Sequence, residues 1–156
     1  MLSKTYRPTL AAMTLGLTAA LAACPAAAQF KKPEDAIKYR QSAMTLQGNH
    51  MGRLFAMVNG RVPFDAKLAA EQIEVISMLN RLQFTAFIAG SDKGDTNALP
   101  EIWSEKEKFA AAVAKSQADV AKLVAAGKTG SLDQIKAAAG AVGQSCKACH
   151  DAYQKP

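Results

Sequence analysis

From residue 33 onward, apolar side chains recur every three or four positions in four stretches, which are separated by segments rich in glycine and proline. This period is typical of amphipathic helices, and no stretch alternates apolar and polar residues for long enough to make a strand. The pattern predicts four helices, over about residues 33–58, 65–86, 100–126 and 131–153. Four helices with short connections favour an all-α fold, an antiparallel up-and-down four-helix bundle.

Residues typical of helix ends support these boundaries. Pro33 suits the first turn of a helix, and the two acidic residues after it complement the positive end of the helix dipole. Asp65 is a good N-cap, and Ser131 opens a capping box. The third helix is expected to begin at Pro100 or at Ser104, after a loop.

The apolar faces of the first and last helices identify the side chains expected inside the bundle. On the first helix these are Ile37, Met44, Met51, Phe55 and Val58. On the last they are Ile135, Ala138, Ala139, Val142, Cys146, Cys149, His150 and Tyr153. Two cysteines and a histidine are therefore expected to face the interior.

Residues 1–28 resemble a secretory signal peptide. Lys4 and Arg7 form a basic start, an apolar run follows, and three alanines before Gln29 make a cleavage site. Cleavage there leaves residues 29–156 as one exported domain, expected in the periplasm. Two alternatives are a lipoprotein with the lipid on Cys24 and an uncleaved membrane anchor.

Composition narrows the function of this domain. The whole chain carries a net charge of +6, of which the predicted signal peptide supplies two positive charges. Because no run of basic residues is interleaved with aromatic ones, nucleic-acid binding is not expected. A mildly basic surface suits acidic partner proteins.

The strongest chemical signal is Cys-x-x-Cys-His at residues 146–150. On a helix, Cys146 and Cys149 are neighbours, so both sulfurs reach the two vinyl groups on one edge of a haem. His150 projects from the same face and can bind the iron. The motif therefore predicts one covalent haem c with His150 as proximal ligand. A zinc ribbon lacks two further ligands, and a thioredoxin-like pair lacks its βαβ context.

These features together resemble the class II cytochromes c, and among them cytochrome c′. The resemblance rests on "CKACHDAY" near the C-terminus, "PEDAIKYRQSAMTL" on the first helix and "PEIWS" before the third. It covers all of residues 29–156. It implies a periplasmic four-helix haem protein, often a homodimer that packs through its first two helices.

Three residues are expected near the edge of the haem. Arg40 interrupts the apolar stripe of the first helix, and the resemblance implies that it lies near a haem propionate. The alternative is an arginine that extends along the bundle edge toward water. Gln41 beside it is a second candidate for the haem edge. Asp95 is a third, on the resemblance alone.

Met44 is the residue expected to face the distal side of the iron. It lies about 16 Å along the first helix from Pro33, at the end where an antiparallel last helix places its haem. Met51 lies deeper, Met57 and Met78 are less well placed, and His50 is expected at a surface or interface. The resemblance implies an apolar Leu, Phe or Tyr here in cytochrome c′, and an iron-binding Met in low-spin members of the class.

Two functions follow from these alternatives. A Met44 ligand favours electron transfer with the iron cycling between Fe(II) and Fe(III), which is the first expectation. A Met44 that only packs leaves a five-coordinate iron that binds NO or CO. No distal histidine or catalytic arginine supports an enzyme. Trp103 is expected to pack the third helix, and Gln154 replaces a basic residue often found there in cytochrome c′.

Overall fold

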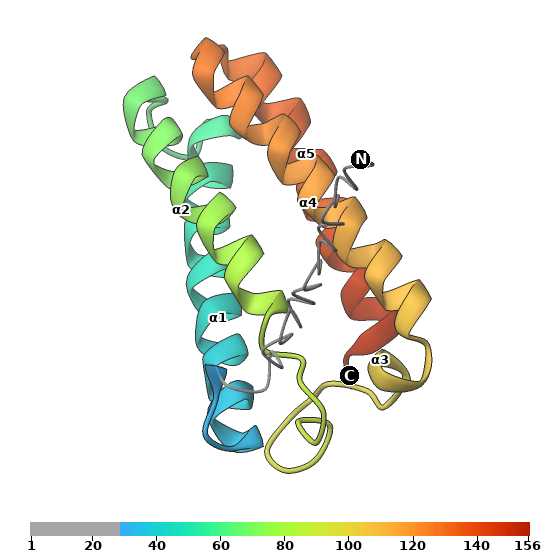
Figure 1. Cartoon of the computed structure of the whole chain (residues 1–156). Coiled ribbons are helices and arrows are strands. Elements are labelled where there is room, and N and C mark those ends of the chain that lie inside the picture. Colours follow the sequence, from blue (N-terminus) through green and yellow to red (C-terminus); the bar gives the residue numbers. More distant parts are fainter. Residues whose placement is uncertain (1–28) are drawn as a thin grey trace, which may run out of the picture.

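The computed structural model describes residues 29–156, so the predicted signal peptide and Cys24 lie outside the described residues. The chain forms α1 (Pro33–Val58), α2 (Ala66–Phe84), the one-turn α3 (Glu101–Ser104), α4 (Lys106–Thr129) and α5 (Leu132–Tyr153). The long helices alternate in direction, α1 packing on α2 and α4 on α5, and the two pairs meet through α2 with α4 and α1 with α5 (Figure 1). The predicted up-and-down four-helix bundle is confirmed.

The predicted helix starts are present. The side chain of Asp65 accepts hydrogen bonds from the backbone N–H groups of Lys67 and Leu68, at 2.8 and 3.0 Å. Ser131 accepts one from the N–H of Gln134 at 3.4 Å. Pro33 is the first residue of α1, with Glu34 and Asp35 in the first turn. Side-chain caps therefore stabilise the starts of α2 and α5, and Pro33 with the two acidic residues after it favours the start of α1.

The third predicted helix differs from the structure at both ends. A break at Glu105 (φ −111°, ψ 49°) separates α3 from α4, and α4 continues past Ala126 to Thr129. Gly127 does not stop the helix. A Cβ there would lie 3.0 Å from Cδ1 of Ile73, so this glycine allows α4 and α2 to approach closely. The helix ends at Gly130, whose φ of +68° favours glycine.

The hydrophobic core fills only one end of the bundle. Its members come from the C-terminal half of α1, the N-terminal half of α2, the C-terminal half of α4 and the N-terminal half of α5. The large, fully buried side chains there are Leu54, Ile73, Ile76, Leu123, Ile135 and Val142. The end near the α1–α2 and α4–α5 turns is thus closed by aliphatic packing, and the opposite end is available for a site.

A short backbone pairing ties the C-terminus to the long loop between α2 and α3. The N–H of Leu99 donates to the carbonyl of Tyr153 at 2.9 Å, and the N–H of Lys155 donates to that of Asn97 at 2.8 Å. The last residues of the chain therefore help to close the end of the bundle that lacks an aliphatic core. Among residues 29–156, no helix has the length and apolar character needed to cross a membrane.

Candidate functional site

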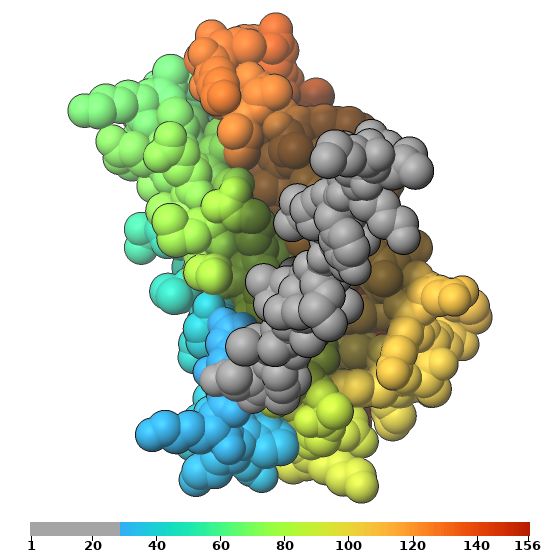
Figure 2. All heavy atoms as spheres, in the orientation of Figure 1, coloured from blue at the N-terminus to red at the C-terminus, as the bar shows by residue number. Residues whose placement is uncertain are grey.

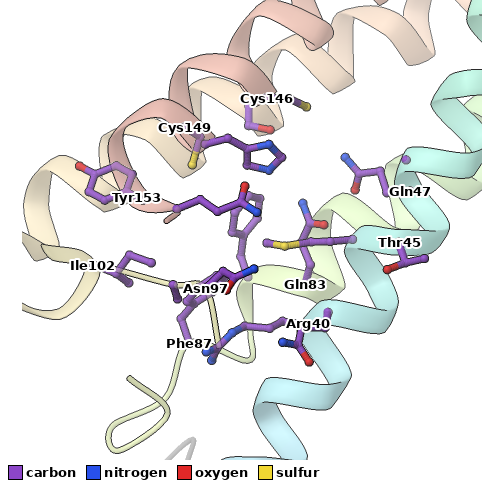
Figure 3. A pocket seen from close by; sticks show the side chains of 18 of the residues that line it. Arg40, Thr45, Gln47, Gln83, Phe87, Asn97, Ile102, Cys146, Cys149 and Tyr153 are labelled. Atoms are coloured by element: carbon purple, nitrogen blue, oxygen red, sulfur yellow. The ribbon is translucent and has the colours of Figure 1, made fainter. Parts of the chain in front are cut away.

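A cavity of about 420 Å³ occupies the end of the bundle opposite the aliphatic core. Side chains from all five helices and from the loop between α2 and α3 line it. In Figure 3, Cys146 and Cys149 on α5 face Arg40, Thr45 and Gln47 on α1 across this space. The cavity therefore lies between the first and last helices, as the sequence predicted for the haem.

The Cys-x-x-Cys-His residues all line the cavity. Cys146, Cys149 and His150 belong to the last two turns of α5, and both cysteines are free and half-buried. Burial raises the pKa of both thiols, and the nearby Cys146 raises that of Cys149 further. Both sulfurs are therefore neutral thiols near pH 7, and both residues line the same cavity.

The residues around the cavity fit a covalently bound haem. Two thiols and an imidazole project into one space, and the facing wall on α1 includes the apolar side chains Met44, Met51 and Phe55. A Cβ added at Gly48 in this wall would meet nothing within 4 Å. Bound here, a haem would be held by Cys146, Cys149 and His150, and its iron would supply redox chemistry and the binding of a further ligand. Among the described residues, no group of three or more His, Cys, Asp and Glu side chains is arranged to hold a metal ion directly.

Met44 lies in the cavity wall as predicted. It is half-buried and lines the cavity. Met51 also lines it but is buried at the start of the core, and Met78 is 55% exposed on α2. His50 lies outside the cavity lining, where its Nδ1 is 2.8 Å from Oε1 of Gln72. Met44 thus remains the first candidate for the distal position, and bonding of its sulfur to iron stays a prediction.

Arg40 is not a side chain that extends toward water, because only 2% of its surface is exposed. Its two terminal nitrogens donate four hydrogen bonds to the loop between α2 and α3. The acceptors are Ala86 O (3.0 Å), Ser91 Oγ (2.7 Å), Ser91 O (2.6 Å) and Thr96 Oγ1 (2.9 Å). The guanidinium also lies 4.7 Å from the ring centre of Phe87. Arg40 therefore holds this loop on α1, a role that the sequence did not predict.

The buried position of Arg40 also affects its charge. Burial lowers its pKa from the ordinary value of an arginine, and no carboxylate among residues 29–156 forms a salt bridge with it. Guanidinium groups stay charged in proteins, so this cation is held by neutral oxygens and aromatic faces alone. The propionate contact stays a prediction, with Nε as the nitrogen not used by the loop.

Gln41 and Asp95 lie next to each other at the rim of the cavity. The side-chain nitrogen of Gln41 donates to the backbone carbonyl of Asp95 at 3.0 Å, and Asp95 itself is exposed. The space-filling view shows the loop against the start of α1 (Figure 2), where a Cβ at Gly90 would lie 3.4 Å from Cγ of Pro33. Contact of Gln41 or Asp95 with a haem edge stays a prediction.

A cluster of aromatic side chains forms part of the cavity wall. Phe109 lies 5.0 Å from Phe87 and 5.3 Å from Tyr153, between ring centres. Trp103 packs on Phe87 at 6.1 Å and donates its Nε1–H to the carbonyl of Ile88 at 3.0 Å. The predicted packing role of Trp103 is thus confirmed. Gln154 also lines the cavity.

Sequence reasoning missed two glutamines that line the cavity, Gln47 on α1 and Gln83 on α2. Both are 5% exposed, and neither side-chain oxygen has a hydrogen-bond partner. A signal was available for Gln47, because it lies one turn after Met44 on the apolar face of the first helix. Gln83 had no such signal.

Comparison with known proteins places the chain in a family. The Cytochrome C' family model matches residues 35–154. Cytochrome c′ of Rubrivivax gelatinosus is 56% identical over 128 residues, which cover 81% of this chain and 99% of that protein. Cytochrome c′ of Alcaligenes xylosoxydans xylosoxydans is 49% identical over 127 residues, covering 81% and 98%.

Solved structures support the same family. The crystal structure of the Rubrivivax protein has a TM-score of 0.80 at 55% identity, covering 81% of this chain and all of that one (100%). Two variants of the Alcaligenes xylosoxidans protein, one solved with NO and one with CO, have TM-scores of 0.78 at 47% identity. They cover 82% of this chain and 99% and 100% of theirs. The family binds one covalent c-type haem, which agrees with the cysteines near the C-terminus. This chain belongs to the cytochrome c′ family.

Proposed function

We propose that this protein binds a diatomic gas, NO or CO, at the iron of its haem. The observation that carries this proposal is the pair of gas complexes formed by variants of the Alcaligenes protein. Those two chains are 47% identical to this one over 99% and 100% of their own length. The haem supplies an iron whose distal position decides between gas binding and electron transfer. The side chains around that position therefore determine the function.

The wall on α1 supports gas binding. The side chains there are the apolar Met44, Met51 and Phe55, with Gly48 between them. Of the two histidines, only His150 lines the cavity. His50 lies outside the lining and is hydrogen-bonded to Gln72. No second imidazole is thus available to fill the distal position. Since both terminal nitrogens of Arg40 bond to the loop, we propose a ligand-binding protein rather than an enzyme.

Electron transfer is the second candidate, and the position of Met44 favours it. A methionine side chain is long and flexible, and a half-buried one in the cavity wall can bring its sulfur to the iron. Ligation would make the iron six-coordinate and low-spin. Gas binding and Met44 ligation therefore compete for one position.

Replacement of Met44 distinguishes the two functions. If Met44 only packs, the purified haem protein is high-spin and binds CO, and Met44→Leu leaves its ferric absorption spectrum unchanged. Met44→Ala removes the cover from the distal side and should speed CO association about tenfold, equivalent to 1.4 kcal/mol. Stopped-flow absorption measures the rates. Met78→Leu on the exposed face of α2 is the matched control.

A low-spin wild-type protein would contradict the proposal that Met44 only packs and that the iron is open to a gas. If Met44→Leu then turned the spectrum high-spin and allowed CO uptake, electron transfer through a His150–Met44 iron would replace it.

We also propose that the protein works in the periplasm as a homodimer. Periplasmic location rests on the signal-like segment 1–28 and on the family. Four exposed large hydrophobic side chains support a dimer through the first two helices: Leu46 on α1 (50% exposed) and Leu68, Met78 and Leu82 on α2 (44, 55 and 37%). Such side chains gain about 25 cal/mol per Å² on burial.

Met78→Lys is expected to shift the dimer to a monomer, because it places a charge in the apolar interface. Light scattering after size exclusion measures the mass. Leu132→Lys on α5, where the leucine is 39% exposed, is the control and should remain dimeric. A monomeric wild type, or a dimer that withstands Met78→Lys, would contradict the use of this face.

A further inference from the structure

Gln47 and Gln83 are two buried polar residues in the wall of the cavity, and we name these two residues the amide pair. They come from neighbouring helices, α1 and α2, and each is 5% exposed. Among buried side-chain oxygens and nitrogens of the described residues, only Oε1 of Gln47 and Oε1 of Gln83 lack a hydrogen-bond partner. Both residues line the cavity that contains His150. Figure 3 shows their amide ends directed toward that space.

Such an arrangement calls for a ligand. A buried amide without a partner costs free energy, and most buried polar atoms in folded proteins are bonded to protein or to ordered water. Here the two unpaired atoms of this kind share one cavity instead of being scattered over the bundle. The amide pair is therefore a preformed site for a ligand that forms hydrogen bonds.

The neighbouring polar side chains are already occupied. The terminal nitrogens of Arg40 bond to the loop, and the side-chain nitrogen of Gln41 bonds to Asp95. The side-chain nitrogen of Asn80, one turn before Gln83, donates to Ser116 at 2.9 Å. None of these three side chains therefore donates to the amide pair.

The haem does not supply a donor either. Its faces carry no hydrogen-bond donor, and its charged groups are the propionates, for which Arg40 is the predicted partner. Gln47 lies seven residues beyond Arg40, about 10 Å further along α1 at 1.5 Å per residue. The polar partner of the amide pair is therefore a small separate molecule.

We propose that the amide pair holds a water molecule on the distal side of the haem cavity, and that an incoming gas must displace it. Water fits because it both donates and accepts, and a half-turn of a glutamine amide exchanges its oxygen for its nitrogen. Buried sites hold a water molecule where two or more polar partners converge. This inference rests on the proposed function for its consequence, since the water acts as a barrier to NO or CO.

The water has a measurable effect on gas entry. Displacing a well-ordered water with a ligand that cannot replace its hydrogen bonds loses affinity, and neither NO nor CO donates a hydrogen bond. The Gln47→Leu/Gln83→Leu double variant should therefore bind CO about tenfold faster than wild type, which corresponds to 1.4 kcal/mol. Each single variant should show an intermediate rate.

The test uses the holoprotein. High-resolution crystal structures of the wild type and the double variant show whether an ordered water lies within hydrogen-bond distance of Gln47 and Gln83, and flash photolysis gives the CO association rates. Gln72→Leu is the matched control: it removes a buried glutamine on α2 whose partner is His50 and which lies outside the cavity lining. It should keep both the water and the wild-type rate. If the double variant fails to fold, the two single variants serve in its place.

The outcomes separate this inference from the proposed function. Water at the amide pair of the wild type, absent from the variant, supports the site even if CO does not bind, and that result would overturn only the gas-binding function. A dry cavity in the wild type overturns the water site even if CO binds well. Unchanged CO rates in the double variant overturn the barrier role. Amides bonded to a haem propionate in the crystal would also overturn the proposal.

Discussion

Protein with Cys146→Ser and Cys149→Ser is expected to lose all covalently bound haem when produced in a host that matures c-type cytochromes. Thioether bonds require the two sulfurs, and serine oxygen does not replace them. Both thiols line the cavity beside His150, and no other cysteine lies in residues 29–156. Extraction with acidified acetone would remove any remaining pigment, and the intact mass would lack the macrocycle.

Lys147→Ala is the matched control for this double variant. Lys147 lies between the two cysteines, 75% exposed at the side chain, and pairs with Asp151 on the surface of α5. Its replacement should leave the covalent haem in place. Cys146→Ser alone should retain a haem through one sulfur. A wild-type protein whose pigment is extracted by acidified acetone would refute the covalent attachment.

Arg40→Leu is expected to destabilise the holoprotein by about 3 kcal/mol. The change leaves three buried acceptors without a donor, Ala86 O, Ser91 O and Ser91 Oγ, and removes one of the two donors to Thr96 Oγ1, which keeps the N–H of Ala98. Each unpaired buried group costs about 1–3 kcal/mol, but removal of the buried charge also removes its desolvation cost, so the net effect is smaller than the sum. Urea unfolding followed by the absorption of the haem measures the free energy of unfolding.

Two further variants check the reason for this loss. Arg40→Lys keeps the charge but has one ammonium group in place of a planar fork, so it should recover only part of the stability. Arg81→Ala, on the exposed side of α2, should change the free energy of unfolding by less than about 0.5 kcal/mol. An Arg40→Leu variant as stable as the wild type would show that the loop between α2 and α3 does not depend on this side chain.

Local signals in the sequence were enough for the helices and for the haem attachment motif. Asp65 and Ser131 cap their helices as predicted because capping involves residues two or three positions apart. The Cys-x-x-Cys-His spacing likewise places its side chains on one side of a single helix. The distal position of Met44 followed from the length of one helix and the antiparallel topology.

Features that depend on contacts between distant segments were not predictable. Gly127 looked like a helix stop, but its role depends on Ile73, which lies on another helix. The hydrogen bonds of Arg40 connect it to residues 46 to 56 positions later. The amide pair is visible only when α1 and α2 are side by side. Periodicity indicates which face of a helix is buried, and it does not show which side chain lies opposite.

The location of the attachment motif on the last helix has a consequence for biogenesis. A polypeptide is synthesised from its N-terminus, so α1, α2 and α4 emerge before residues 146–150. The pairing of Leu99 with Tyr153 and of Asn97 with Lys155 requires the final residues of the chain. Residues 146–150 are therefore the last part of the haem cavity to be synthesised, after the helices that form its other walls.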